Sequence, residues 1–387
     1  MSRAPLGVLD LVPIPSGATA ADALRNSVDL VRRTEEFGYT RYWFAEHHLN
    51  PGVAGVSPAV VIALTAASTS TIRLGSGVVQ LGHRTPLSVV EEFGLIDALF
   101  PGRLDLGLGR SGGGPTPRSA PSSNVDSSGH APNGLRIPPR FAVEKLASSP
   151  RFRVHQALLK QPGAQTPDYA DQVAEVLDLL SGTYRGDEGL EVRPVPGAGA
   201  RVQVWIHGSS GGTSAIAAGK HGLRFGTNYH VAPSGVLDAV EAYRAAFQPS
   251  ADLSRPYVIV SADVVVAEDE ASARELATGY PLWVRSIRTA EGAIPFPAPH
   301  EARRHVWTDE DRRLVADRVE TQFVGSPAQV ADGLELLQDA TGADELLITT
   351  ITHDHRDRIR SYELLAAEWS GRGGAEAPGI AASNSLV

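Results

Sequence analysis

The first 110 residues alternate four times between short apolar runs and segments whose apolar residues recur at helical spacing. The apolar runs cover residues 6–12, 39–44, 71–80 and 103–109, and helical periodicity fills 20–37, 58–70 and 85–99. Strands that alternate with helices and short loops lie parallel and are joined by right-handed crossovers. The chain therefore begins as an α/β protein with a parallel sheet.

Four more strands are predicted after residue 110, which gives eight in total. They are expected at residues 202–206, 223–227, 257–266 and 345–351. Helical segments follow these strands, one of them expected over residues 270–283. The count favours a single (β/α)8 TIM-like barrel with insertions over two doubly wound domains. We expect the barrel to span residues 1–370 and a flexible C-terminal tail to cover 371–387. No Gly-x-Gly-x-x-Gly sequence follows the first strand, so a dinucleotide-binding Rossmann fold is not predicted.

Residues 111–166 interrupt the alternation. The segment is rich in Ser, Gly, Pro and Arg, and its part 141–159 could hold one or two short helices or a hairpin. Loops of this length in compact domains are usually either functional or disordered. We expect a lid over the carboxyl end of the barrel. A disordered tether with no role is the alternative that the sequence leaves open.

Charge and composition argue against several classes of function. The formal net charge is −9 and the pI about 5.7, so no overall basic field attracts nucleic acid. No run approaches the roughly 18 apolar residues of a membrane span, and no secretory signal is recognisable. The chain has no cysteine, which excludes disulfides, thiolate metal ligands and cysteine nucleophiles. We expect a cytoplasmic protein that binds neither nucleic acid nor membrane.

The second predicted strand ends in three ionisable residues, Glu46, His47 and His48. The carboxyl ends of barrel strands carry the active site, so these residues are catalytic candidates. Adjacent side chains project to opposite sides of an extended chain, so at most one of the two histidines is expected to reach the pocket. Five further histidines lie near later strand ends: His207, His221, His230, His353 and His355. A metal site is nevertheless not predicted, because the first strand does not end in His-x-His and no pair sits at helical i, i+4 spacing with a carboxylate. A structural ion pair between Glu46 and one histidine is the alternative.

A small, hydroxyl-rich turn joins the fifth predicted strand to its helix. Its sequence is Ile206-His207-Gly208-Ser209-Ser210-Gly211-Gly212-Thr213. Small residues let backbone N–H groups approach a ligand, hydroxyls can donate, and a helix N-terminus carries partial positive charge. The composition favours phosphate binding over an ordinary capped turn. Arg110 directly follows the fourth strand and can form a bidentate contact with a phosphate; a salt bridge to a loop is its alternative.

Four motifs occur in an order and spacing that are specific together. They are Ala45-Glu46-His47-His48, Gly75-Ser76-Gly77-Val78, Pro101-Gly102-Arg103-x-Asp105-x-Gly107-x-Gly109-Arg110 and the Gly-Ser-Ser turn. Together they resemble the bacterial luciferase-like flavin-dependent monooxygenases, over nearly the whole chain apart from 111–166 and the tail. The resemblance implies a barrel that binds FMN, reduced by a separate flavin reductase, and uses O2 to oxidise an organic small molecule. We also expect a homodimer.

The same resemblance assigns individual residues. His47 would lie beside the isoalloxazine ring and steady the oxygenated flavin, with Glu46 and His48 supporting it. The phosphate would be held by Arg110, Ser209, Ser210 and Thr213. Gly77 and Val78 would form a non-proline cis peptide against one face of the flavin. Glu91 matches a glutamate that follows the third strand in luciferases.

Two departures from the family pattern limit what the resemblance implies. Relatives often have Pro-Asn-His where this chain has Leu81-Gly82-His83-Arg84, so flavin contacts there are open. The insertion is longer and more polar than usual, so the substrate pocket cannot be copied. Apolar walls for a dry cavity could come from Trp43, Phe44, Trp205, Ile206 and Trp283, with plain core packing as the alternative. A deazaflavin-dependent dehydrogenase and a non-catalytic flavin-binding protein are the rival functions.

Overall fold

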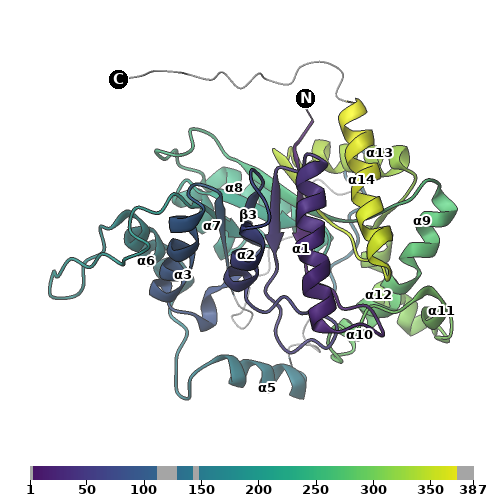
Figure 1. Ribbon diagram of the computed structural model, residues 1–387, viewed down its shortest axis with the longest axis horizontal. Helices are drawn as coiled ribbons and strands as arrows, with labels where there is room; N and C mark the ends of the chain where they lie inside the picture. Colours follow the sequence, from purple (N-terminus) through teal and green to yellow (C-terminus); the bar gives the residue numbers. More distant parts are fainter. Residues whose placement is uncertain (1–2, 111–128, 143–147, 373–387) are drawn as a thin grey trace.

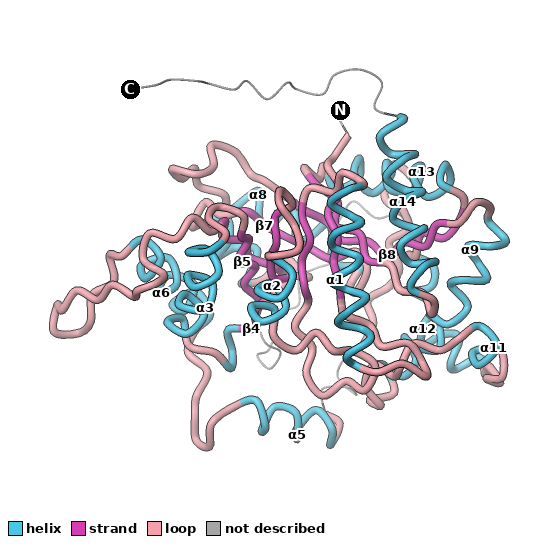
Figure 2. The backbone as a smooth tube through the Cα atoms, viewed as in Figure 1, coloured by secondary structure: helices cyan, strands magenta, loops and turns pink. Residues whose placement is uncertain are grey.

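Eight parallel strands close into a barrel in the computed structural model, which describes residues 3–110, 129–142 and 148–372. The strand order is β10-β1-β2-β3-β5-β6-β7-β8, and β8 pairs with β10 to close the ring. Helices surround the barrel (Figures 1 and 2). The (β/α)8 fold predicted from the alternating pattern is confirmed, and each of the eight expected strands has its counterpart.

The strands are β1 (Leu6–Asp10), β2 (Arg41–Phe44), β3 (Arg73–Ser76), β4 (Val79–Gln80), β5 (Leu104–Gly109), β6 (Gln203–His207), β7 (Arg224–Asn228), β8 (Val258–Val266), β9 (Phe323–Gly325) and β10 (Glu345–Thr349). The α-helices are α1 (Ala20–Glu36), α2 (Pro58–Ala66), α3 (Pro86–Leu99), α5 (Pro150–Leu159), α6 (Tyr169–Ser181), α7 (Thr213–Lys220), α8 (Val236–Ala246), α9 (Glu270–Leu276), α10 (Tyr280–Arg288), α11 (Pro299–Ala302), α12 (Asp309–Glu320), α13 (Pro327–Thr341) and α14 (His355–Arg372). Three short 3-10 helices are η1 (Leu81–His83), η2 (Pro233–Gly235) and η3 (Ala277–Gly279).

Three elements differ from the sequence-based prediction. The expected strand 71–80 is divided into β3 and β4 around Gly77 and Val78. The expected helix 270–283 is divided into α9 and α10, because Pro281 has no N–H to donate to the preceding turn. The short strand β9, which pairs with the end of β8, was not predicted.

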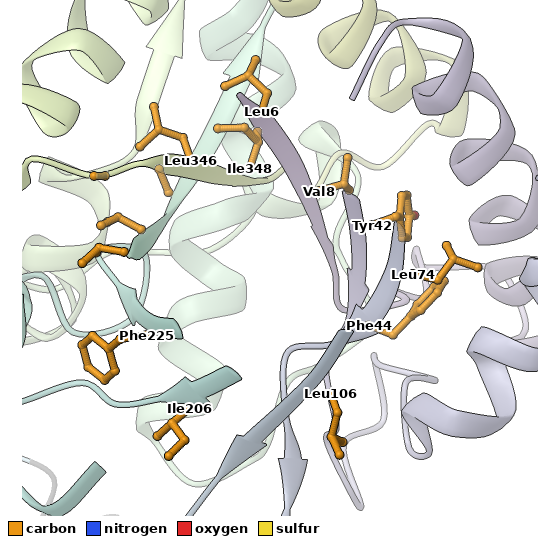
Figure 3. Packing of buried hydrophobic residues seen from close by; sticks show 14 of the residues in the cluster. Leu6, Val8, Tyr42, Phe44, Leu74, Leu106, Ile206, Phe225, Leu346 and Ile348 are labelled. Atoms are coloured by element: carbon orange, nitrogen blue, oxygen red, sulfur yellow. The ribbon is translucent and has the colours of Figure 1, made fainter. Parts of the chain in front are cut away.

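The outer layer of the core lies between the strands and the surrounding helices. Alternate residues of each strand point outward and pack there, among them Val8, Tyr42, Phe44 and Ile206 (Figure 3). Helices present apolar stripes to this layer, as α1 does with Leu30. Burial of these side chains is the dominant force that holds helices to the barrel.

The barrel interior is filled by two layers beneath the mouth. Near the amino ends of the strands, Arg41 pairs with both Asp105 and Glu345, and all three are buried. Above these three charged residues, the rings of Trp43 and Trp205 pack edge to face, with centroids 5.0 Å apart. Both indoles are fully buried, so they pack the core.

Two predicted segments lie partly outside the described residues. Of the insertion 111–166, the structure describes 129–142 and 148–166, and α5 occupies part of the stretch expected to be helical or hairpin. α14 continues to Arg372, two residues into the expected tail, and 373–387 are outside the described part. Among the described helices, none is long and apolar enough to cross a membrane.

Candidate active site

A cavity of about 970 Å³ opens at the carboxyl ends of the barrel strands. This end carries the active sites of (β/α)8 enzymes. Six of the residues predicted to bind the cofactor line it: Gly77, Val78, Arg110, Ser209, Ser210 and Thr213. They come from three separate strand ends, so the fold brings together residues more than 130 positions apart. None of the five residues considered as apolar walls lines this cavity.

The turn between β6 and α7 presents unused donors to the cavity. Gly212 caps α7 without a side-chain hydrogen bond, so no side chain competes for the first-turn N–H groups. Among the described residues, the hydroxyls of Ser209, Ser210 and Thr213 have no hydrogen-bond partner, and the Arg110 guanidinium has no ion pair. An arginine, three hydroxyls and a helix N-terminus together form a site for a phosphate.

Tyr169 of α6 supports this anion site from beneath and was not predicted. Its hydroxyl donates to the carbonyl of Leu108 at 3.1 Å. Burial raises its pKa, and the nearby Arg110 and a hydrogen bond with Ser214 oppose that rise only in part. The phenol therefore stays neutral at pH 7, and its charge does not compete with a phosphate.

A backbone bulge forms the wall between β3 and β4. The Gly77–Val78 peptide is cis, as the resemblance implied. The Val78 side chain lies over β5, where a β-carbon on Gly109 would stand 2.2 Å from its Cγ2. A β-carbon on Gly77 would in turn stand 2.8 Å from Cδ1 of Leu9. Glycine at both positions leaves room for the bulge to face the cavity with its backbone exposed.

Glu46 is the centre of a buried hydrogen-bond cluster beside the cavity. Its Oε1 lies 2.8 Å from His48 Nε2, 3.0 Å from His83 Nε2 and 3.3 Å from Arg84 Nε. Its Oε2 accepts from the Gln80 N–H at 2.9 Å. Burial alone would raise its pKa, but these hydrogen bonds and the Arg84 charge lower it to about 2. Glu46 is therefore ionised at neutral pH.

This cluster answers two questions that the sequence left open. His83 and Arg84, which depart from the family pattern, contact Glu46 rather than line the cavity. The ligand atoms of Glu46, His48 and His83 lie within 4.8 Å of one another, a spacing that could hold a cation. However, the guanidinium of Arg84 already contacts the shared oxygen, so the cluster is held together without a cation.

His47 is the predicted catalytic residue, and it does not line the large cavity. Burial, followed by the proximity of His48, lowers its pKa to about 4, so the imidazole is neutral at pH 7. Its Nδ1 is buried without a partner among the described residues. Burial, followed by the charge of Arg318 and the proximity of His47, lowers the pKa of the cavity-lining His230. Glu91 of α3 also lies away from the cavity lining.

Several cavity residues were not predicted as site residues. His207, Asn228, His230 and Ser261 line the cavity from β6, β7 and β8; two of them had been considered only as metal ligands. His207, Asn228 and His230 lie at or just after the ends of predicted strands, and that position was the signal that could have found them. Ser261 lies within the predicted strand 257–266, where no sequence signal marks it. The described part of the insertion also forms one wall, and Phe141 of that wall packs beneath the Arg288 guanidinium at 4.0 Å.

Sequence comparisons identify relatives over most of the chain. The sequence model described as luciferase-like monooxygenase matches residues 5–122 and 147–344. A luciferase-like monooxygenase of Escherichia coli strain K12 is 34% identical over 357 residues, 92% of this chain and 94% of that protein. An N-acetyl-S-alkylcysteine monooxygenase of Bacillus subtilis strain 168 is 50% identical over 243 residues, 62% of this chain and 61% of that protein.

Solved structures give the same fold with different cofactors. Apo-MsnO8 matches with a TM-score of 0.76 and 30% identity, covering 95% of this chain and 98% of that one. A type II Baeyer–Villiger monooxygenase component from Pseudomonas putida, in complex with FMN, has a TM-score of 0.63 at 18% identity, covering 96% and 98%. An F420-dependent secondary alcohol dehydrogenase has a TM-score of 0.59 at 14% identity, covering 95% and 99%.

Proposed function

The chain belongs to the luciferase-like monooxygenase family and is an oxidoreductase, and from this premise we propose that it uses reduced FMN and O2 to oxygenate an organic small molecule. The observation that carries the proposal is the anion site at the cavity mouth. There, Arg110 has no ion pair among the described residues, and the hydroxyls of Ser209, Ser210 and Thr213 have no partner. A cavity of about 970 Å³ lies within the range that accommodates cofactors and a small substrate.

The predicted residues other than Glu91 have roles that their surroundings support. Arg110 and the β6–α7 turn bind the phosphate and thereby fix where the ring system lies. Gly77 has no side chain, so the backbone of the bulge at Gly77 and Val78 could contact one face of the isoalloxazine ring. FMN would supply the electrons and the site for O2. His47 is neutral at pH 7 and can accept a proton, while the ionised Glu46 orients His48 and His83.

The experiment is a flavin titration followed by exposure to air. Quenching of FMN fluorescence measures binding, and the absorbance of oxidised flavin measures reoxidation of anaerobically reduced FMN after air is admitted. We expect stoichiometric binding and reoxidation slower than that of free reduced FMN. If FMN does not bind and the free rate is unchanged, the proposal fails.

The same titration tests the two rival functions. A phosphate site does not select the ring that the phosphate carries, so a deazaflavin is titrated in parallel. Tighter binding of the deazaflavin would favour the dehydrogenase. FMN binding without O2 consumption in the presence of candidate substrates would favour a non-catalytic flavin protein. Thioethers are the substrates to test first, because a relative 50% identical over 243 residues is named for N-acetyl-S-alkylcysteines.

Two partners complete the proposal. Reduced FMN would come from a separate flavin reductase, as the family resemblance implies. A second copy of the chain would cover α2 and α3, which lie side by side and expose Leu64 and Leu95 at 59% and 58% (Figure 1). Apolar residues this exposed on neighbouring helices are typical of a protein interface. The cytoplasmic location expected from the sequence stays a prediction.

A further inference from the structure

A polar patch lies inside the barrel mouth on three adjacent strands. The strand register pairs His207 of β6 with Gly226 of β7, and Asn228 of β7 with Ser261 of β8. Residues two positions apart on a strand share a face. His207, Asn228 and Ser261 therefore face the barrel interior together, and all three line the cavity.

Two side chains of this patch have polar atoms without a partner. Nε2 of His207 and Oδ1 of Asn228 are buried, and neither has a hydrogen-bond partner among the described residues. Ser261 differs, because its hydroxyl lies 2.7 Å from Nδ1 of His230. Buried polar groups in folded proteins are nearly always paired, since an unpaired one destabilises the fold. Two unpaired polar side-chain atoms at a cavity wall therefore indicate a ligand that supplies their hydrogen-bond partners.

The patch is electrically neutral, and this restricts the ligand. Burial lowers the pKa of His207 to about 3, so at pH 7 its ring offers one N–H donor and one lone pair and carries no charge. Of the cations that line the cavity, Arg318 acts on the neighbouring His230, and it is paired with Asp263 at 3.2 Å and with the Tyr280 hydroxyl at 3.1 Å. A charged ligand group would find no free counter-charge here, whereas a neutral group with one donor and one acceptor would be matched.

We propose that His207 and Asn228 form a binding site for an uncharged amide-type group. The imidazole N–H donates to the carbonyl of that group, and the Asn228 side-chain oxygen accepts from its N–H. The inference rests on the proposed function, since it assigns one wall of the same cavity. The same chemistry occurs in an amide-bearing substrate and at the imide edge of the isoalloxazine ring, and the experiment separates these sources.

The test uses a matched pair of probes on the full-length protein. N-acetyl-S-benzylcysteine carries an acetamido group, and 3-(benzylthio)propanoic acid lacks it but keeps the thioether, the ring and the carboxylate. Calorimetry measures binding of both probes with saturating oxidised FMN, and fluorescence quenching measures FMN affinity. The variants are His207→Leu and Asn228→Leu, with His207→Asn as the conservative change. Thr349→Val is the control, because it too removes a buried unpaired polar atom, the Thr349 hydroxyl, but at a residue that does not line the cavity.

We expect the wild-type protein to prefer the amide probe about tenfold, since two neutral hydrogen bonds at the lower end of their usual strength together contribute about this factor. Both leucine variants should lose that preference without a lower melting temperature, and His207→Asn should keep part of it. If the leucine variants instead weaken FMN binding about tenfold, the site exists and its ligand is the flavin. If both leucine variants fold and neither measurement changes, the inference is wrong.

Failure of the proposed function gives a different result from failure of the amide-site inference. In that case the wild-type protein does not bind FMN at all, and the probe titrations, repeated without flavin, still test the amide site. A probe preference that persists in both leucine variants contradicts the inference even where FMN binds as expected.

Discussion

The imidazole of His207 occupies the space that a side chain at Gly226 would need. A β-carbon on Gly226 would stand 2.3 Å from Cε1 and 2.5 Å from Nε2 of that ring. Real β-carbons do not approach ring atoms so closely, so the position of the ring depends on glycine at 226. The carboxyl end of β7 is thus shaped around a histidine of the neighbouring strand.

Gly226→Ala should displace the His207 ring and lower stability together. Overpacking a buried site by one methyl group costs about 1–3 kcal/mol, which urea unfolding measures. The displaced ring should also weaken binding of whatever ligand contacts it, by calorimetry. Gly371→Ala is the matched control, because nothing lies within 4 Å of the added carbon. Equal stability of the two variants would contradict the packing argument.

Arg110→Ala should weaken FMN binding through the phosphate. A charge-assisted hydrogen bond contributes about 1.5–3 kcal/mol, so the Kd should rise roughly tenfold to a hundredfold. Fluorescence quenching measures the Kd, and riboflavin, which has no phosphate, is the control ligand. Riboflavin affinity should be the same in both proteins. A parallel loss for riboflavin would place Arg110 against the ring instead.

His47→Ala should leave FMN affinity within about twofold but change what happens to O2. The family resemblance places His47 near the isoalloxazine ring, where its neutral imidazole would donate its N–H to bound oxygen and slow the release of H2O2. The variant should release more H2O2 per reduced FMN consumed, as a peroxidase-coupled assay measures. If His47→Ala loses only FMN affinity, the assignment of its role is wrong.

The sequence predicted the fold well because the evidence for it is local. Apolar runs, helix caps and glycine turns lie within a few residues of one another, so each strand and helix could be recognised alone. β9 was missed because three residues carry no readable periodicity. The interruption at Pro281, by contrast, was readable, since proline lacks the N–H that a continuing helix requires.

The site was predictable only where it is contiguous. The turn with Ser209 and Ser210 lies in one stretch of sequence, as does the bulge at Gly77. The placement of His207 and Asn228 on the same cavity wall depends on the register of β6 against β7, which no local pattern reports. Trp205 was considered as a cavity wall, and it lies instead in the layer beneath.

Stability should fall on mild acidification because of His207. Its pKa in the folded protein is about 3, whereas an unfolded histidine titrates near pH 6.5. The unfolded chain therefore takes up a proton first, so the stabilisation is complete above about pH 6.5 and is lost as pH falls toward the folded pKa. Between about pH 8 and about pH 5 this one group accounts for about 2 kcal/mol.

His207→Leu should reduce the difference in unfolding free energy between those two pH values by about 2 kcal/mol. The pH range separates this effect from Glu46, whose pKa is about 2 and whose contribution is lost only below about pH 4.5. His300→Gln, a change at an exposed histidine, is the control. An unchanged pH profile in His207→Leu would mean that the pKa of His207 is not lowered in the folded protein.

Leu64→Glu and Leu95→Glu should dissociate the proposed homodimer. These residues project from α2 and α3, and a charge on each would have to be buried without a partner when two copies associate. Sedimentation velocity over a range of protein concentrations measures the association. Val306→Glu introduces the same charge at an apolar residue that is 84% exposed. Val306 belongs to the segment between α11 and α12, which lie away from α2 and α3 (Figure 1), so the dimer should stay intact. Monomeric wild-type protein, or dimers that survive both leucine substitutions, would show that this face is not the interface.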